Sequence, residues 1–349
     1  MTPFPRPAYT PLTLYAPDRR PVAIDLSDNT SRHGPHPAAL RLVREAGPGA
    51  LTSYPSVYAD ALREAVSDRF GVGLECITTG CGSDGLIDAV FRAAGEPGEP
   101  IAYPAPTFSM VGVFARMNGM EPLPSPGGGN GNLTTLLDPA PAVVYLCRPN
   151  NPTGETVSRA RVEALVEAGG SDGPVIVIDE AYADYADDDF LHAAAASHRL
   201  VVLRTFSKAY GLAGLRTGFA VGAPEVILEI EKSRGPYQVN RLAEAAAALA
   251  LRDAEGWIPK VVAGVRRERR RLTTALREQG WAPLDSDANF VLLPLPGRSA
   301  REVVAALRER GVAVRPFPGL AGIGDAVRIS VGRAEENDRF LAALKEVTG

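Results

Sequence analysis

The apolar run Val175-Ile-Val-Ile-Asp179 constrains the fold more than any other segment of the chain. A continuous run of β-branched residues is typical of a strand that is buried on both faces of a mostly parallel sheet. Similar short runs alternate with helical patterns, and we predict further strands at Cys76–Thr79, Pro100–Tyr103, Ala142–Cys147, Leu200–Arg204 and Gly218–Val221. This alternation predicts an α/β fold, with three layers (α/β/α) around a mostly parallel sheet.

The pattern changes after Arg252. An arginine-rich helix is predicted at Val261–Gln279, followed by strands at Ala288–Pro294, Val312–Arg315 and Ala326–Val331 and a helix at Ser299–Arg310, which together indicate a smaller α+β domain. A chain of 349 residues is expected to form two domains. We divide it into a proline-rich arm at residues 1–35, which packs with the small domain or a partner, a large domain at 36–250 and a small C-terminal domain at 251–349. The glycine-rich stretch 127–132 is predicted to be a surface loop.

Composition limits the partners and the compartment. The formal net charge of −4 gives no reason to expect nucleic acid or an anionic membrane as partner. The sequence shows no signal-peptide core and no apolar run long enough to cross a bilayer. Its three cysteines have no metal-ligand spacing, which suits a reducing compartment. We therefore predict a cytoplasmic protein without a metal site. Asp187–Asp189 are interpreted as an exposed loop or helix cap, and Arg266–Arg271 as a solvated helix face.

Gly80, Gly82 and Gly85 lie between a predicted strand and a predicted helix at Leu86–Ala94. Glycines let the backbone approach a ligand, and the free N–H groups at the start of a helix favour a phosphate. The spacing also matches a dinucleotide fingerprint, which requires an acidic residue about 20 positions further on. The segment Tyr103–Thr107 contains no acidic residue, so we reject a dinucleotide site.

Three more polar groups follow predicted strands: the turn Pro149–Gly154, then Asp179 and Tyr182, then Thr205, Ser207 and Lys208 with Arg216. Taken alone, the segment Pro149–Gly154 is an ordinary turn, and Lys208 is a solvated loop residue. However, the carboxyl ends of such strands line the crevice in which α/β sheets bind ligands. A buried carboxylate about 4 Å from a pyridinium nitrogen would contribute roughly 4 kcal/mol. A lysine amine can carry an aldehyde cofactor whose phosphate the hydroxyls and Arg216 bind.

The set Asn151, Asp179, Tyr182, Lys208 and Arg216 resembles, in order and spacing, the fold-type I, class II aminotransferases that depend on pyridoxal 5'-phosphate (PLP). Within them the chain resembles the histidinol-phosphate aminotransferase family. The match extends over nearly the whole chain and is carried by Ala102–Met110, Pro149–Gly154, Val177–Tyr182, Leu203–Gly218, Tyr237–Arg241, Ala288–Phe290 and Val327–Gly332.

The resemblance implies a role for each matching residue. The implied catalytic residues are Lys208, Asp179 and Tyr182. The implied cofactor-binding residues add Gly82, Ser83, Asp84, Phe108, Asn151, Thr205, Ser207, Arg216 and Tyr54. Tyr54 would reach the cofactor of the neighbouring subunit, which implies a homodimer. The implied substrate-binding residues are Tyr15, Asn29, Tyr237, Arg315 and Arg328, the last of these on the carboxylate or phosphate of the substrate.

The implied function is the transfer of an amino group between histidinol phosphate, or an aromatic or related amino acid, and 2-oxoglutarate by a ping-pong Schiff-base mechanism. Thr30, Phe108 and Ser53 depart from the residues usual in the family; the first two weaken the inference to histidinol phosphate and leave transamination intact. A PLP-dependent decarboxylase or cyclase of the threonine-phosphate decarboxylase type shares the same anchor residues and is the alternative. A PLP-sensing regulatory module is a second alternative, but the sequence shows no DNA-binding helix-turn-helix.

Overall fold

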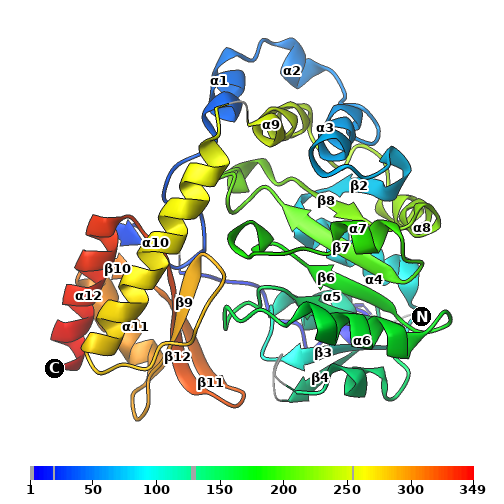
Figure 1. The fold of residues 1–349 in the computed structure, drawn as a ribbon. Helices are drawn as coiled ribbons and strands as arrows, with labels where there is room; N and C mark the ends of the chain where they lie inside the picture. The colour runs from blue at the N-terminus through cyan, green and yellow to red at the C-terminus, as the bar shows by residue number, and fades with distance from the viewer. Residues whose placement is uncertain (1–3, 19, 127–130, 254) are drawn as a thin grey trace.

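The computed structural model describes residues 4–18, 20–126, 131–253 and 255–349 of the chain. A seven-stranded sheet lies at its centre, with the strand order β2-β8-β7-β6-β5-β3-β4 (Figure 1). The strands are β2 (Ile77–Gly80), β3 (Pro100–Ala105), β4 (Glu121–Pro126), β5 (Val143–Cys147), β6 (Val175–Asp179), β7 (Leu200–Thr205) and β8 (Gly218–Val221). Neighbouring strands are parallel except at β8, which is antiparallel to both β2 and β7, so the predicted mostly parallel sheet is confirmed.

Helices cover both faces of this sheet, which explains the continuous apolar runs in the sequence. On β6, Val177 joins a core with helices α4 (Gly82–Ala94), α5 (Met110–Met117) and α8 (Pro224–Arg234). Ile176 and Ile178 belong to the core on the opposite face, with α1 (Pro37–Glu45), α3 (Asp60–Phe70), α6 (Arg159–Gly169), α7 (Leu191–Ala195) and α9 (Arg241–Arg252). The predicted α/β/α layers are therefore confirmed, and Asp179 ends a fully covered strand.

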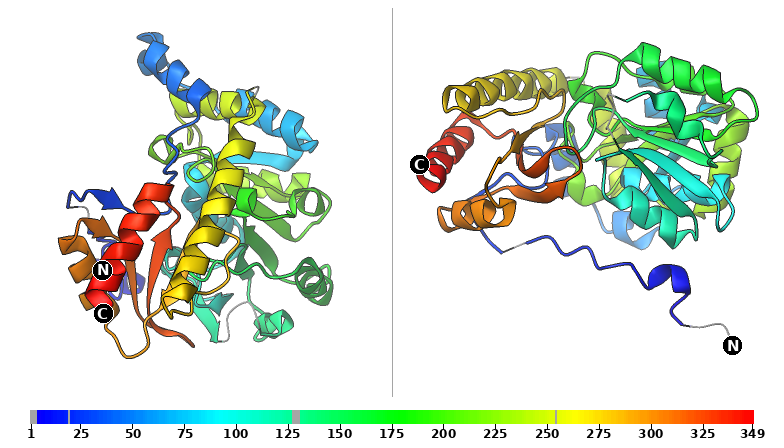
Figure 2. Two further views of the ribbon diagram at one scale, coloured as in Figure 1. Left: turned by 60° about the vertical axis from the view of Figure 1, so that its left-hand side comes forward. Right: turned by 90° about the horizontal axis from the view of Figure 1, so that it is seen from below.

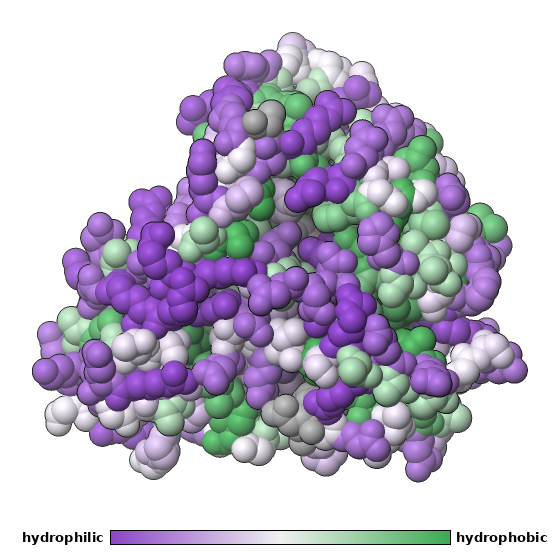
Figure 3. Space-filling model, viewed as in Figure 1, coloured by the Kyte–Doolittle hydropathy of each residue, from purple (hydrophilic) through white to green (hydrophobic). Residues whose placement is uncertain are grey.

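Helix α10 (Trp257–Glu278) connects this body to a second one (Figure 1). Val261 and Val265 near its start pack in the core of the large sheet, whereas Leu272 and Leu276 near its end pack in a second core. That core contains the antiparallel sheet β11-β12-β9, formed by β9 (Phe290–Pro294), β11 (Arg315–Leu320) and β12 (Gly324–Ser330), with helices α11 (Ala300–Glu309) and α12 (Ala334–Thr348). Hydrophilic side chains cover the face of α10 that Figure 3 shows.

The N-terminal segment joins the second core. Ile24 and Leu26 are buried in it, and β1 (Ile24–Asp25) pairs in parallel with β10 (Val312–Ala313). Before that, Arg6 Nη2 donates to the carbonyl of Met117 at the end of α5 (2.7 Å), and the segment then runs along the outside of the molecule (Figure 2). On this basis we propose residues 1–35 as an arm on the small domain, with the large domain at 36–250 and the small domain at 251–349.

Two predictions about strands were wrong. The predicted strand Val312–Arg315 is divided between two sheets, because β10 pairs with β1 whereas Arg315 begins β11, which pairs with β12. Strand β4 was not predicted because it contains three prolines; it pairs only with β3, and proline is tolerated on such an edge strand. Residues 127–130 of the predicted glycine-rich loop lie outside the described residues.

Short elements complete the chain. Helix α2 spans Gly49–Thr52, and 3-10 helices lie at Pro7–Tyr9, Leu74–Cys76, Leu133–Leu137, Ala183–Tyr185 and Ala213–Leu215. Within the described ranges, we find no helix with the length and apolar character needed to span a membrane.

Candidate active site

A cavity of about 520 Å³ lies at the carboxyl ends of β5, β6 and β7 and extends to β11 and β12. This volume is in the range of sites that hold a small molecule or cofactor. The sequence-predicted residues that line it are Tyr15, Asn29, Ser83, Asp84, Phe108, Asn151, Asp179, Tyr182, Thr205, Ser207, Lys208, Arg216, Arg315 and Arg328. Residues separated by up to 313 positions in the chain, from Tyr15 to Arg328, therefore meet in one site.

Asp179 is 3% exposed at the end of β6. One carboxylate oxygen accepts a hydrogen bond from the Tyr145 hydroxyl (2.7 Å) and the other accepts from the backbone N–H of Ala181 (3.0 Å). Burial raises the pKa of Asp179 to about 6, and these two donors partly offset the effect of burial. A cationic group facing this carboxylate would therefore be strongly stabilised.

Lys208 lies in the turn after β7, with its Nζ 3.5 Å from the carbonyl oxygen of Asp28 and 5.5 Å from the centre of the Tyr182 ring. Burial, followed by the charge of Arg328, lowers the pKa of Lys208 to about 8. A substantial fraction of the amine is then neutral near physiological pH, the form in which lysine acts as nucleophile or base.

A phosphate cradle forms where α4 begins. Arg216 lies 3.1 Å from a carboxylate oxygen of Asp84 and 3.5 Å from the Ser207 hydroxyl, which in turn lies 3.0 Å from the Thr205 hydroxyl. Gly82 does not line the cavity itself, but a Cβ at this position would lie 2.9 Å from Arg216 Nη2, so glycine allows the close approach. Hydroxyls, helix N–H groups and a guanidinium together are the partners that a phosphate requires.

Arg328 of β12 is 8% exposed and donates to two neutral acceptors, Asn151 Oδ1 (2.5 Å) and the carbonyl of Ser27 (2.8 Å). Its Nε is buried and has no hydrogen-bond partner among the described residues. Burial lowers the pKa of Arg328, and the charge of Arg315, its register partner on β11, adds to the effect. A buried guanidinium with a free donor favours a carboxylate or phosphate ligand.

Asn29 lies in the cavity wall at φ 57°, but its side chain bonds within the protein. Its Nδ2 donates to the Tyr182 hydroxyl (3.1 Å), and its Oδ1 accepts from the Ser330 hydroxyl (3.0 Å). Burial raises the pKa of Tyr182, which is therefore a neutral phenol. Asn29 was predicted to bind substrate; it lines the cavity, and its side chain also links Tyr182 to β12.

Besides Gly82, two predicted residues lie outside the cavity of the single chain. Tyr54 is 78% exposed, and its ring lies 5.0 Å from the ring of Tyr237, which is 44% exposed. Neither lines the cavity. These two aromatic residues could contact a cofactor or substrate only in a site shared with a second copy of the chain.

The family model for aminotransferase class I and II matches residues 21–344. The chain belongs to this family. It is 37% identical to an aromatic amino acid aminotransferase of Streptomyces avermitilis over 92% of this chain and 89% of that protein. It is 35% identical to a histidinol-phosphate aminotransferase of Acetobacter pasteurianus over 98% of this chain and 95% of that protein. The solved histidinol-phosphate aminotransferase of Sinorhizobium meliloti, in complex with PLP, has a TM-score of 0.89 and 29% identity and covers 98% of this chain and 96% of its own.

The predicted class of enzyme, fold and cofactor are thereby confirmed: the chain is a PLP-dependent aminotransferase of fold type I. The cavity fits the cofactor, because it offers a phosphate cradle, a lysine amine and a buried carboxylate for the ring nitrogen. Asp179 has hydrogen-bond donors around it, and the missing partner of this buried anion is a cation.

Several residues in or near this aminotransferase site were not predicted, and three of them lie on its strands. Phe317 lies two positions after Arg315 on β11, so alternation along the strand places both side chains on the face toward the cavity. Its ring centre lies 5.5 Å from the Arg328 guanidinium. Cys147 is the register partner of Asp179 on β5, and Tyr145 lies two positions before it. Strand periodicity was the signal that could have identified all three.

Proposed function

We propose that this aminotransferase uses an aromatic amino acid as its preferred amino donor and 2-oxoglutarate as acceptor. The observation that carries the proposal is the wall around Arg328, where Phe317 and Phe290 flank the guanidinium and Tyr15 and Phe108 line the same cavity. A flat apolar side chain bound through its carboxylate to Arg328 would contact Phe317 and Tyr15, whereas Phe290 is fully buried and packs against the guanidinium from outside the cavity. The aromatic amino acid aminotransferase of S. avermitilis supports the same choice.

A second candidate donor is histidinol phosphate. Arg315 and Arg328 are register partners on adjacent strands, and two guanidiniums offer more donors than one carboxylate uses. The Arg315 guanidinium lies 5.3 Å from the centre of the Tyr15 ring, a cation–π contact from which it would have to turn toward a phosphate. The histidinol-phosphate aminotransferase of A. pasteurianus supports this candidate.

The deciding measurement is the ratio of kcat/KM for phenylalanine and histidinol phosphate, each with 2-oxoglutarate. We expect phenylalanine to be preferred at least about tenfold, which corresponds to about 1.4 kcal/mol of transition-state stabilisation. A preference for histidinol phosphate of that size would overturn the aromatic assignment and select the second candidate.

We assign roles to the residues of the site as follows. PLP, when bound, supplies an electron sink for the negative charge that develops at the substrate's α-carbon. Lys208, with its lowered pKa, accepts and returns the α-proton, and Asp179 keeps the ring nitrogen protonated. Tyr182 would donate to the phenolic oxygen of the ring, and Phe108 and Asn151 would hold the ring in place. Gly82, Ser83 and Asp84 would border the phosphate, and Thr205, Ser207 and Arg216 would bind it. The substrate would meet Tyr15, Asn29, Arg315 and Arg328.

We further propose a homodimer in which Tyr54 and Tyr237 serve the site of the partner chain. Tyr54 belongs to an exposed apolar group with Leu51, Val57 and Tyr58, whose exposures are 81%, 37% and 42%. Such a group on a water-soluble chain is typical of an interface. The three cysteines are unpaired, which supports a cytoplasmic location. Membership of the aminotransferase family favours transamination over the decarboxylase, cyclase and PLP-sensing alternatives.

A further inference from the structure

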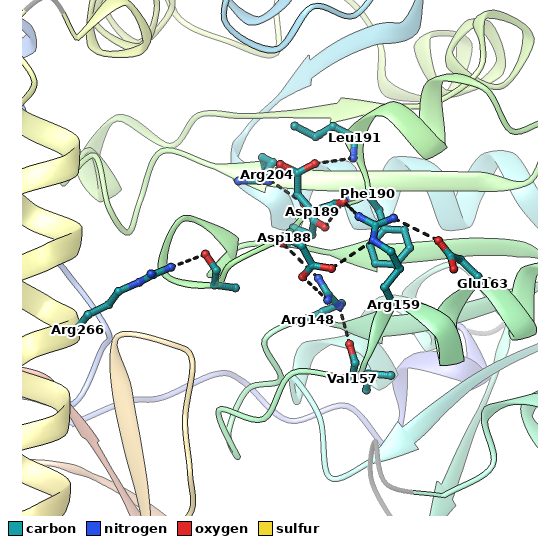
Figure 4. Close-up of polar contacts among 12 residues, drawn as sticks. Arg148, Val157, Arg159, Glu163, Asp188, Asp189, Phe190, Leu191, Arg204 and Arg266 are labelled. Carbon is teal, nitrogen blue, oxygen red and sulfur yellow. Dashed lines mark hydrogen bonds and ion pairs between the residues drawn. The ribbon is translucent and has the colours of Figure 1, made fainter.

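The three consecutive aspartates between Tyr185 and α7 each pair with an arginine from a different element. Figure 4 shows the pairs of Asp188 and Asp189. Asp187 pairs with Arg266 of α10 (2.9 Å), Asp188 with Arg148 after β5 (2.5 Å) and Asp189 with Arg204 of β7 (3.2 Å). The interpretation of this run as an exposed loop or helix cap holds in part. Asp189 accepts from the N–H of Leu191 at the start of α7 (3.2 Å), as a cap would, but the aspartates also form the ion pairs given above. The pairs differ most in how far their arginines are buried.

Arg148 is 2% exposed, which makes it the largest fully buried side chain among the described residues. Its guanidinium donates to the carbonyl of Val157 (2.7 Å) and to Asp188 Oδ1 (2.5 Å), and lies 5.0 Å from the centre of the Phe190 ring. A buried guanidinium requires a nearby negative charge. Asp188 supplies it, and this carboxylate also lies 3.4 Å from Arg159 of α6.

Arg148 directly precedes the turn Pro149–Gly154, which carries Asn151. Its own N–H donates to the carbonyl of Asp179 (2.8 Å), so its backbone is held to β6 while its side chain is held to Asp188. Within the turn, Asn150 accepts from the Thr107 hydroxyl (2.8 Å) and donates to the carbonyl of Pro106 (3.0 Å).

The next residue, Asn151, faces the cavity instead. Its Oδ1 accepts from Nη1 of Arg328 (2.5 Å), the guanidinium proposed to bind the substrate's carboxylate. The orientation of Arg328 therefore depends on where the turn holds Asn151. Since Arg148 fixes the start of that turn, its partner Asp188 acts on Arg328 through two intervening residues.

We propose that Asp188 is a positioning residue for substrate binding: by neutralising the buried Arg148, it fixes the turn that holds Asn151 against Arg328. The inference rests on the proposed role of Arg328 as the carboxylate anchor. Asp187 provides a matched control, because it is the adjacent residue and also pairs with an arginine, but it is 93% exposed and its partner Arg266 is 30% exposed. Exposed pairs of this kind contribute little.

The test uses the PLP-loaded protein and 3-phenylpropionate, which has the carboxylate and ring of phenylalanine but no reacting amine. We expect Asp188→Asn to weaken the binding of 3-phenylpropionate about tenfold, or about 1.4 kcal/mol, as read from the change in cofactor absorbance. The affinity of the apoprotein for PLP should fall less than that for 3-phenylpropionate, because the cradle and Lys208 lie on other turns and only Asn151 among the proposed cofactor contacts lies on this one. Asp187→Asn should leave both affinities unchanged.

Two further variants make every outcome decisive. Arg328→Met, which Phe290 and Phe317 can accommodate, should abolish binding of 3-phenylpropionate; if it binds normally, the proposed function of Arg328 is wrong. If Arg328→Met loses binding and Asp188→Asn does not, only the positioning role is wrong. An equal loss of PLP and 3-phenylpropionate affinity in Asp188→Asn would also overturn that role. If Asp188→Asn does not fold, the double variant Arg148→Met/Asp188→Leu removes the buried guanidinium together with its partly exposed partner, and normal carboxylate binding by it refutes the proposal.

Discussion

Replacing Asp179 by asparagine should make the PLP-free protein more stable while it disables the loaded enzyme. In the absence of the cofactor, the carboxylate is buried at 3% exposure with two neutral donors and no cation in contact. The raised pKa of Asp179 means that burial destabilises the ionised carboxylate by more free energy than the two hydrogen bonds stabilise it. Asparagine has nearly the same shape and carries no charge, so it removes this cost.

The magnitude follows from the pKa. At about 1.4 kcal/mol per pH unit, the rise from 3.8 to about 6 corresponds to about 3 kcal/mol. Part of this gain is lost, because asparagine accepts at only one of its two side-chain atoms. Its Oδ1 can keep the bond from the N–H of Ala181, while the Tyr145 hydroxyl turns to accept from Nδ2. Exchanging a charged hydrogen bond for a neutral one costs about 1 kcal/mol, which leaves a gain of about 2 kcal/mol.

The gain should depend on pH in a defined direction. Below about pH 4 the Asp179 carboxyl is protonated in both the folded and the unfolded chain, so the wild-type and variant apoproteins differ little. Between pH 3.8 and about 6 the unfolded chain loses this proton while the folded protein keeps it, and the wild type loses stability relative to the variant. Above about pH 6 the full difference is present.

Thermal unfolding of PLP-free wild type and Asp179→Asn at pH 4 and pH 8 measures this difference. We expect the variant's Tm to be several degrees higher at pH 8 and nearly equal to that of the wild type at pH 4. The loaded variant should lose several orders of magnitude in turnover, because the ring nitrogen is no longer held protonated. A variant apoprotein that is less stable than wild type at pH 8 would refute the reasoning about the buried charge. Near-normal turnover would refute the catalytic role of Asp179.

Two further predictions concern the cofactor lysine and the shared site. Lys208→Ala should remove the covalent Schiff base between the chain and the cofactor, so that borohydride no longer attaches the cofactor to the protein. Borohydride reduction of the wild type followed by peptide mapping should find the reduced adduct on Lys208; an adduct on another lysine rejects the assignment. Mixing inactive Lys208→Ala with weakened Tyr54→Phe should raise activity, because each mixed dimer contains one site with both native residues. Proven subunit exchange without any gain would contradict the shared site.

The cofactor side of the site could be predicted from the sequence because of how parallel sheets are built. Asp179 and Lys208 follow runs that read as buried strands, and neighbouring parallel strands end at the same edge. Their proximity therefore followed from strand order and not from any contact visible in the sequence. The division of Val312–Arg315 between two sheets could not be foreseen. It depends on the pairing of β1 with β10, in which Ile24 lies opposite Val312, a residue 288 positions further along the chain.

The substrate side was less predictable, because its residues bond across the chain. Asn29 reads as an isolated polar residue, yet its two side-chain bonds go to Tyr182 and Ser330, which lie 153 and 301 positions away. The rings of Tyr54 and Tyr237 lie 5.0 Å apart, outside the cavity of the single chain. The role of each of these side chains depends on which residues the fold brings next to it, and those neighbours cannot be predicted from residue type alone.

Buried charge explains why the aspartate run was misread and why its three members should differ. Asp187, Asp188 and Asp189 are identical in the sequence, and a run of like charges is normally solvated. The structure gives them arginines of 30%, 2% and 7% side-chain exposure. Arg204 also has Glu180 at 2.9 Å and Asp184 at 3.5 Å, so it keeps a counter-charge without Asp189. Arg148 depends on Asp188 for its ion pair within the described chain. Of the three, Asp188 is therefore the one whose loss leaves a buried arginine without an ion pair among the described residues, next to the turn that carries Asn151, although the buried Glu180 still acts on Arg148 at longer range.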